Sequence, residues 1–124
     1  MIKEYGKKVM AKPPLCPVEP IYTAGGIAYD PYIHEVIPAL IKGKRNLITK
    51  ATDAGLSPDF NPCNLIMSGA VVSGENEVTV DAYSAVCGNW DDQASNTWQL
   101  MAKAAQKPIY FWDIPRFDNR SDKW

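Results

Sequence analysis

Three side chains have the chemistry of a nucleophilic site, although they lie far apart in the sequence. Histidine exchanges protons near neutral pH, and the chain contains one, His34. Cys87 could supply a thiolate nucleophile, and Asp91 could orient the imidazole ring. A hydrolase or transferase would require that the fold brings these three residues together. A half-exposed helical histidine and a buried, inert cysteine are the simpler interpretation, so we assign no catalytic residue.

A second group of side chains has the chemistry of a small-ligand site. Aromatic rings can stack on a base, and cations can pair with a phosphate, so together they would suit a phosphorylated or nucleotide-like ligand. The residues with these properties are Tyr29, Tyr32, His34, Lys44, Arg45 and Trp90. They can act together only if the turn from Gly25 to His34 and the loop from Cys87 to Asp91 meet at one pocket.

Tryptophan and tyrosine are also common where proteins contact one another, because each combines a large apolar area with one polar group. The chain has 4 tryptophans in 124 residues, which is a high proportion. Trp90 lies on a predicted loop, while Tyr110 and Trp112 lie on the last predicted strand. We therefore predict that these three residues contribute to an interface, with core packing as the competing interpretation.

The spacing of metal-binding residue types does not indicate a metal or cofactor site. Cys16, Cys63 and Cys87 are far apart, their number is odd, and they form no CxxC motif. Asp91 and the aspartate after it have no third oxygen ligand at a familiar spacing, so helix capping explains them better. The glycine-rich turn before Asp30 belongs to no GxGxxG or GKS/T pattern. We expect neither a metal nor a cofactor.

Charge and hydropathy restrict the partners of the protein. Lys and Arg number 13 against 14 Asp and Glu, which gives a formal net charge of −1. This balance argues against nucleic acid as a partner, and the cluster of Lys42, Lys44 and Arg45 alone does not outweigh it. No apolar run approaches the ~20 residues of a membrane-spanning helix, and the first residues contain no apolar signal segment. We expect a cytoplasmic protein with reduced thiols and no membrane contact.

Residues 64–83 give the most readable pattern of secondary structure. Val78, Val80 and Ala82 alternate with polar residues, which predicts a strand with one buried face. Residues 64–72 are apolar on both faces, which we interpret as a central strand covered on both sides. A short polar loop joins the two, so this stretch is predicted to be a β-hairpin.

Two helices flank the predicted hairpin. Apolar residues recur at helical spacing from Ile33 onward, but Pro38 either kinks this first helix or separates two helices. Gly55 is placed to be its left-handed cap. The second helix is predicted from residue 91 or 92 to about residue 106, with Trp98 on its apolar stripe.

The remaining segments complete an α+β pattern. Short strands are predicted at 7–11 and 109–114, and the four prolines of 12–20 predict an extended connector. The fold class is therefore α+β, with a small antiparallel or mixed sheet of about four strands and two helices, in the ferredoxin-like order βαββαβ; a different α+β sandwich remains open. Residues 1–114 are predicted to form a single domain, and 115–124 a polar C-terminal tail.

These patterns favour a small non-enzymatic binding or interaction protein that acts as a homo-oligomer. Two helices would not cover both apolar faces of such a sheet, so a second copy or another protein would cover the remainder. The alternative is a binding or catalytic site for a nucleotide-like ligand near the turn from Gly25 to His34 and the loop from Cys87 to Asp91.

Overall fold

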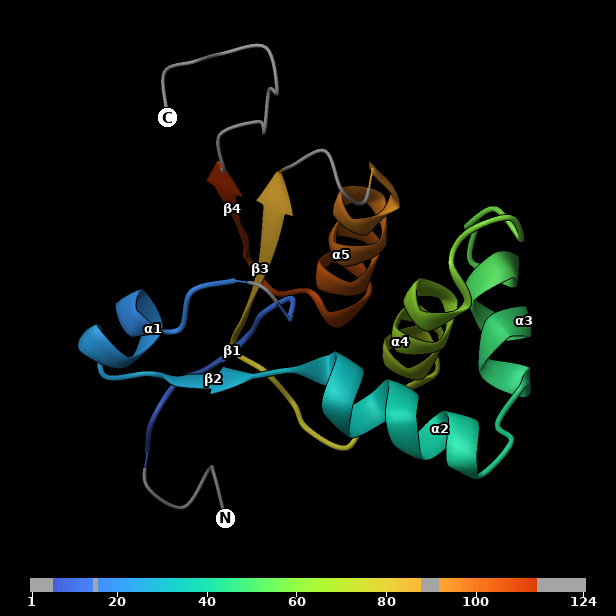
Figure 1. Ribbon diagram of the computed structural model, residues 1–124, viewed down its shortest axis with the longest axis horizontal. Helices are drawn as coiled ribbons and strands as arrows, with labels where there is room; N and C mark the ends of the chain where they lie inside the picture. Colours follow the sequence, from blue (N-terminus) through green and yellow to red (C-terminus); the bar gives the residue numbers. More distant parts are fainter. Residues whose placement is uncertain (1–5, 15, 88–91, 114–124) are drawn as a thin grey trace, which may run out of the picture.

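The computed structural model describes residues 6–14, 16–87 and 92–113 (Figure 1). Strands and helices alternate along most of this chain. In order they are β1 (Val9–Ala11), α1 (Glu19–Thr23), β2 (Ile27–Tyr29), η2 (Tyr32–Val36), α2 (Ile37–Ile41), α3 (Asn46–Asp53), α4 (Pro62–Ser73), β3 (Ala82–Cys87), α5 (Asp92–Ala105) and β4 (Ile109–Asp113). No helix within the described ranges is both long enough and apolar enough to cross a membrane.

The four strands form one parallel sheet in the order β2-β1-β3-β4. The predicted antiparallel or mixed sheet with two helices, and with it the ferredoxin-like order, is therefore wrong. The main reason is that residues 64–72, predicted to be a strand, belong to a helix. Parallel strands need a crossover between them, and helices supply every crossover in this sheet.

The predicted first strand of the hairpin is the helix α4. Asn61 caps its start, since its side chain accepts a hydrogen bond of 2.9 Å from the Cys63 amide, and Pro62 occupies the first helical position. Gly74 ends the helix with a left-handed φ of 71°. An apolar run cannot be assigned to a helix or to a strand by its periodicity when every face of the element is buried.

The second half of the predicted hairpin is also displaced. Residues 78–81 lie outside any strand, and β3 begins at Ala82 and continues to Cys87. Residues 84–87 thus belong to an inner strand of the sheet, where Ser84 and Ala85 are buried. An inner strand can bury a short polar side chain such as Ser84 when it is hydrogen-bonded.

The helical segment runs without a gap through Pro38, so this residue does not separate two helices. A π-helical turn, η2, leads directly into α2, and the Ile37 amide donates to the carbonyl of Tyr32. Pro38 lies in the first turn of α2, where its missing N–H is tolerated. The break comes later, at Gly43, whose φ is +64°.

Several predicted features are confirmed. The helix α5 has the expected position, with Trp98, Met101 and Ala102 buried, and β4 begins where predicted. Gly55 has a φ of 110° after α3, and the following amide of Leu56 donates to the carbonyl of Ala51 at 3.3 Å. The short elements α1 and β2 were not predicted, because three to five residues carry too little periodicity.

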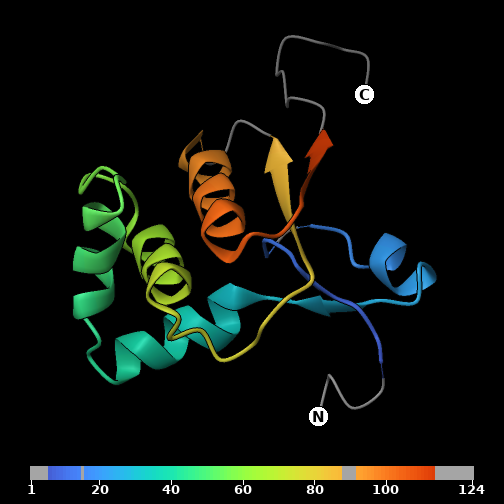
Figure 2. The same cartoon turned by 180° about the vertical axis from the view of Figure 1, so that it is seen from behind.

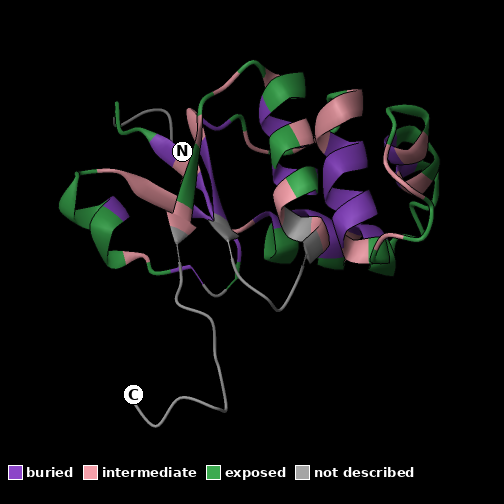
Figure 3. Cartoon of the chain, turned by 90° about the horizontal axis from the view of Figure 1, so that it is seen from above, coloured by how far each residue is buried: buried purple, intermediate pink, exposed green. Residues whose placement is uncertain are grey.

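The helices cover the two faces of the sheet unequally. The helices α4 and α5 lie on one side, with α3 beyond α4, while α1 alone lies on the other side and contacts β2 (Figures 2 and 3). The most buried helix is α4, with every residue from Asn64 to Ala70 buried between its neighbours. The core is therefore made mainly by one face of the sheet and α4.

A glycine sets the distance between α3 and α4. A Cβ atom on Gly69 would overlap the backbone carbonyl of Leu47 in α3. Because a backbone carbonyl cannot rotate away as a side chain can, the two helices would have to separate. Gly69 is thus required by close helix packing rather than by its conformational freedom.

We predict that Gly69→Ala lowers the free energy of unfolding by about 1–3 kcal/mol, or by more if the helices cannot move apart. Thr49→Ala, on the exposed side of α3, is the matched control and should change it by no more than about 0.5 kcal/mol. Urea denaturation followed by circular dichroism measures both. A neutral or stabilising Gly69→Ala would contradict the observed packing.

Candidate functional site

The carboxyl ends of all four strands meet at one edge of the sheet, because the strands are parallel. The chain passes from β1 to β2 in one direction and from β2 to β3 in the other, so its winding reverses between β1 and β3. In open α/β sheets, ligands bind outside the carboxyl ends at such a reversal. This edge is the first place to look for a site.

Lys12 occupies this edge, directly after β1. The residue is 9% exposed, and its ammonium donates to the carbonyls of Pro13 and Pro14 at 3.3 and 3.2 Å. Asp30, which follows β2, has its carboxylate 3.5 Å from the same nitrogen. Lys12 therefore fastens the proline-rich connector to the end of β2. The sequence pattern gave one overlooked signal, a lysine at the end of a short apolar strand.

Ser84 and Cys16 fill the space on the β3 side. The Ser84 hydroxyl donates to the carbonyl of Ala11 at 3.0 Å and lies 4.0 Å from the Cys16 sulfur. Burial raises the pKa of the Cys16 thiol, and the hydrogen bond to Ser84 and the charge of Lys12 only partly oppose this effect. Burial and the raised pKa both disfavour the thiolate form of Cys16, as is typical of a packing residue.

The predicted ligand-binding residues divide between separate environments. Tyr29 is buried and stacks on His34, with ring centroids 5.1 Å apart. Lys44 shares with His34 a cavity of about 20 Å³, large enough for a water molecule but not for a nucleotide. Tyr32 lies at the surface beside Cys63, which raises the pKa of the Tyr32 hydroxyl. Arg45 lines a second hollow, between α2, α3 and α4, which Lys44 also borders.

The predicted loop from Cys87 to Asp91 is only partly covered by the structure. Cys87 is the last residue of β3, at the carboxyl edge of the sheet. The Cys87 side chain, Trp90 and Asp91 lie outside the described residues. The catalytic constellation with His34 and the meeting of the two loops therefore stay predictions.

A buried carboxylate, Glu35, was missed by the sequence analysis. One of its oxygens accepts hydrogen bonds from the Tyr29 hydroxyl at 2.9 Å and from the Glu77 amide at 2.8 Å. Burial raises the pKa of Glu35, although these two donors and the nearby Lys44 oppose it. Burial, together with the Glu35 charge, also raises the pKa of Tyr83 to about 12. Glu35 thus joins η2, β2 and the segment before β3, and this role is structural.

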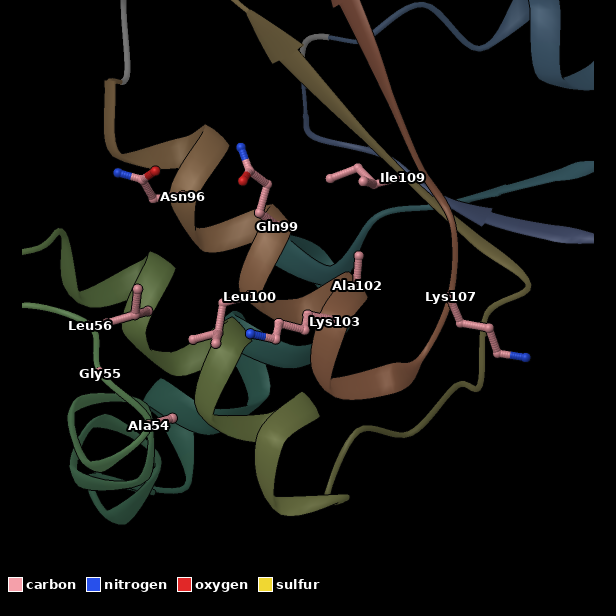
Figure 4. Close-up of a pocket in the computed structure, with 10 residues that line it drawn as sticks. All are labelled: Ala54, Gly55, Leu56, Asn96, Gln99, Leu100, Ala102, Lys103, Lys107 and Ile109. Carbon is pink, nitrogen blue, oxygen red and sulfur yellow. The ribbon is translucent and has the colours of Figure 1, made fainter.

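A further hollow has a volume of about 530 Å³, a size common for small-ligand sites (Figure 4). It lies between the end of α3, the outer side of α5 and the start of β4. Its lining residues are Ala54, Gly55, Leu56, Asn96, Gln99, Leu100, Ala102, Lys103, Lys107 and Ile109. Figure 4 shows Lys103 and Lys107 pointing in opposite directions. Because its cations do not converge, this hollow lacks the chemistry of a built ligand site.

Metal-binding residue types and similarity to known proteins give no further indication of function. The described residues contain no group of three or more His, Cys, Asp or Glu side chains that could hold a metal ion. No protein-family model matches this chain, and no curated protein is significantly similar to it.

Glu35 generates a prediction about pH. Since its pKa in the folded protein lies above its ordinary value of 4.5, the folded state binds this proton more tightly than the unfolded state. Protonated Glu35 therefore stabilises the folded state. This contribution is complete at pH values below the ordinary pKa and is lost as the pH rises through the raised pKa. Glu35→Gln keeps an acceptor oxygen without the charge, so the variant should gain stability relative to the wild type between about pH 4 and pH 8.

Urea denaturation at a series of pH values measures this difference. Glu19→Gln, at an exposed position on α1, is the control and should follow the wild-type curve. The opposite result would be a wild type that becomes more stable than Glu35→Gln as the pH rises. It would mean that the fold favours the charged carboxylate, and the raised pKa of Glu35 would be wrong.

Proposed function

We propose that the protein is a small, non-enzymatic interaction protein that forms a homo-oligomer through β4. The observation that carries this proposal is an exposed aromatic edge. The strand β4 is at the end of the described sheet and has β3 as its one neighbour there. Tyr110 and Phe111 are 55% and 45% exposed, which is high for adjacent aromatic residues on a strand.

The register of the sheet supports the same surface. Tyr83 contacts Trp98 of α5 edge to face, with ring centroids 6.2 Å apart, so this side of β3 is covered. The next residue, Ser84, is paired with Tyr110, and side chains alternate between the faces of a strand. Tyr110 therefore lies on the face away from α5. Since α1 packs on β2 at the opposite end of the sheet, none of the described helices covers this end of that face.

A second copy is the partner that this geometry suits. Two β4 strands related by a two-fold axis would pair edge to edge, and each would satisfy the backbone groups of the other. Tyr110 and the half-buried Trp112 would lie on the shared face of the joined sheet. The sequence analysis expected that the helices would be too few to cover both faces of the sheet. In the structure, the uncovered area is confined to one face near β4.

A small nucleotide-like ligand is the second candidate. The segment from Asp30 to His34 leaves β2, and the chain leaves β3 at Cys87, so both depart from the carboxyl edge beside the reversal in winding. Native mass spectrometry of gently purified protein tests this candidate. A retained mass of a few hundred daltons per subunit would support it, and bare subunits would count against it.

We also infer a reducing compartment, and place the protein in the cytoplasm. Two thiols support this inference. Cys16 and Cys63 are both free in the structure, whereas an oxidising compartment favours disulfides. Labelling of these thiols in extracts prepared with an alkylating reagent tests the assignment, which extensive disulfide formation would contradict.

The interface prediction has a matched pair of variants. Light scattering should give the wild type about twice the monomer mass of 13.8 kDa. Tyr110→Lys should restore the monomer mass, since a charge on the edge strand opposes pairing. Tyr22→Lys, a change of the same residue type at 56% exposure on α1, should leave the dimer intact. A monomeric wild type, or a dimer unaffected by Tyr110→Lys, would contradict the proposal.

A further inference from the structure

A second apolar surface lies far from β4, on the helix formed by η2 and α2. Ile33, Ile37, Leu40 and Ile41 recur at helical spacing and are 54%, 41%, 58% and 80% exposed. The adjacent side of the same helix supplies Val36 and Ala39 to the core. A surface helix normally carries one apolar stripe that faces the core. The apolar side of this helix is wider than such a stripe, and the described residues cover only the part that contains Val36 and Ala39.

A hollow extends this exposed stripe sideways. It has a volume of about 410 Å³ and lies between α2, α3 and the first turns of α4. Leu40, Ile48, Pro62 and Ile66 supply its apolar lining, and Ile66, at 3% exposure, is among its most buried members. Because Leu40 belongs to both, the stripe and the hollow form one continuous apolar surface, which we call the α2 surface.

Positive charge borders the α2 surface at one end. Lys44 and Arg45 line the hollow, and Lys42 precedes them at the end of α2. All three are exposed. Among the described residues none of the three forms an ion pair, whereas Lys8, Lys12 and Lys50 each do. The sequence analysis treated this cluster as a candidate phosphate contact, but its setting beside an apolar hollow indicates a different ligand.

We propose that the α2 surface binds an acidic amphipathic helix of another protein. Apolar residues of the partner, spaced at i, i+3 or i+4, and i+7, would enter the hollow between Leu40 and Ile66 in the manner of helix-in-groove recognition. Carboxylates on its flank would pair with Lys42, Lys44 and Arg45. Charge complementarity of this kind specifies the partner and its orientation.

The distribution of charge disfavours a second copy at this surface. In a parallel pairing, the basic clusters of the two chains would face each other. In an antiparallel pairing, each cluster would face the start of η2, where Asp30 is already paired with Lys12 and Glu35 is buried against Tyr29. The exposed Glu77 lies beside Glu35, but it already shares a cavity with Lys42 and Lys44 of its own chain. Neither arrangement therefore offers a row of carboxylates that matches the three cations, which favours a foreign partner.

A phage-displayed library of random peptides about 16 residues long, roughly four helical turns, tests the proposal against the immobilised full chain. Enriched peptides should combine helical apolar spacing with Asp or Glu. In fluorescence anisotropy, Ile41→Asp should weaken their binding by about tenfold or more. Tyr22→Asp is the control, since Tyr22 is similarly exposed but lies on α1. Both variants alter exposed side chains, and their circular dichroism should match that of the wild type.

Charge reversal provides the sharper test. Arg45→Glu should weaken the binding of the acidic peptides by about tenfold, and peptides with Lys in place of Glu should regain it. Peptides without acidic residues, binding unaffected by Ile41→Asp, or no enriched peptide would each overturn the proposal.

Two other outcomes would reassign the α2 surface. Sedimentation with phosphatidylserine vesicles that is lost in Ile41→Asp would assign it to an anionic bilayer. A fall in oligomer mass caused by Ile41→Asp would assign it to a second copy. Tyr110→Lys should leave peptide binding unchanged, so failure of the β4 interface and failure of this proposal are distinguishable.

Discussion

The burial of α4 is the constraint on which the rest of the structure depends. Every residue from Asn64 to Ala70 is buried, and Gly69 allows the backbone of α3 to approach closely. Polar groups inside this helix are satisfied locally, as when the Ser68 hydroxyl donates to the Asn64 carbonyl at 2.7 Å. With α4 as a crossover helix, β3 returns parallel to β1, and the carboxyl ends of all strands meet at one edge. Ile37, Leu40 and Ile41 of α2 stay outside this core and are exposed.

Much of the fold could be predicted from apolar periodicity and capping residues. Prediction failed where the periodicity fits a helix and a strand equally well. The helix α5 was predictable because Trp98 and its neighbours mark one stripe beside polar positions. Residues 64–72 have no polar face, so both helical and strand periodicity fit them. The capping signals of Asn61 and Gly74 were sufficient to decide in favour of a helix. Glu35 and Lys12 could not be assigned, because their burial depends on neighbours distant in the sequence.

Buried charge and exposed apolar area lie in different parts of the molecule. The buried ionisable groups already have partners: Glu35 holds Tyr29 and the Glu77 amide, and Lys12 holds two carbonyls beside Asp30. Exposed large apolar residues gather instead at β4 and along η2 and α2. Figures 1 and 2 show these two places at different ends of the molecule. One core thus supports two surfaces of different chemistry, an aromatic sheet edge and an apolar helix with a basic border.

Hydrogen–deuterium exchange at low and high protein concentration tests this division of roles most directly. Pairing of two copies at β4 should slow the exchange of the amides of Ile109–Asp113 as the concentration rises. The amides of Ile37–Ile41 should exchange at the same rate at both concentrations, because their partner is absent. Slower exchange in α2 with no change in β4 would contradict the account, and so would identical exchange in both segments.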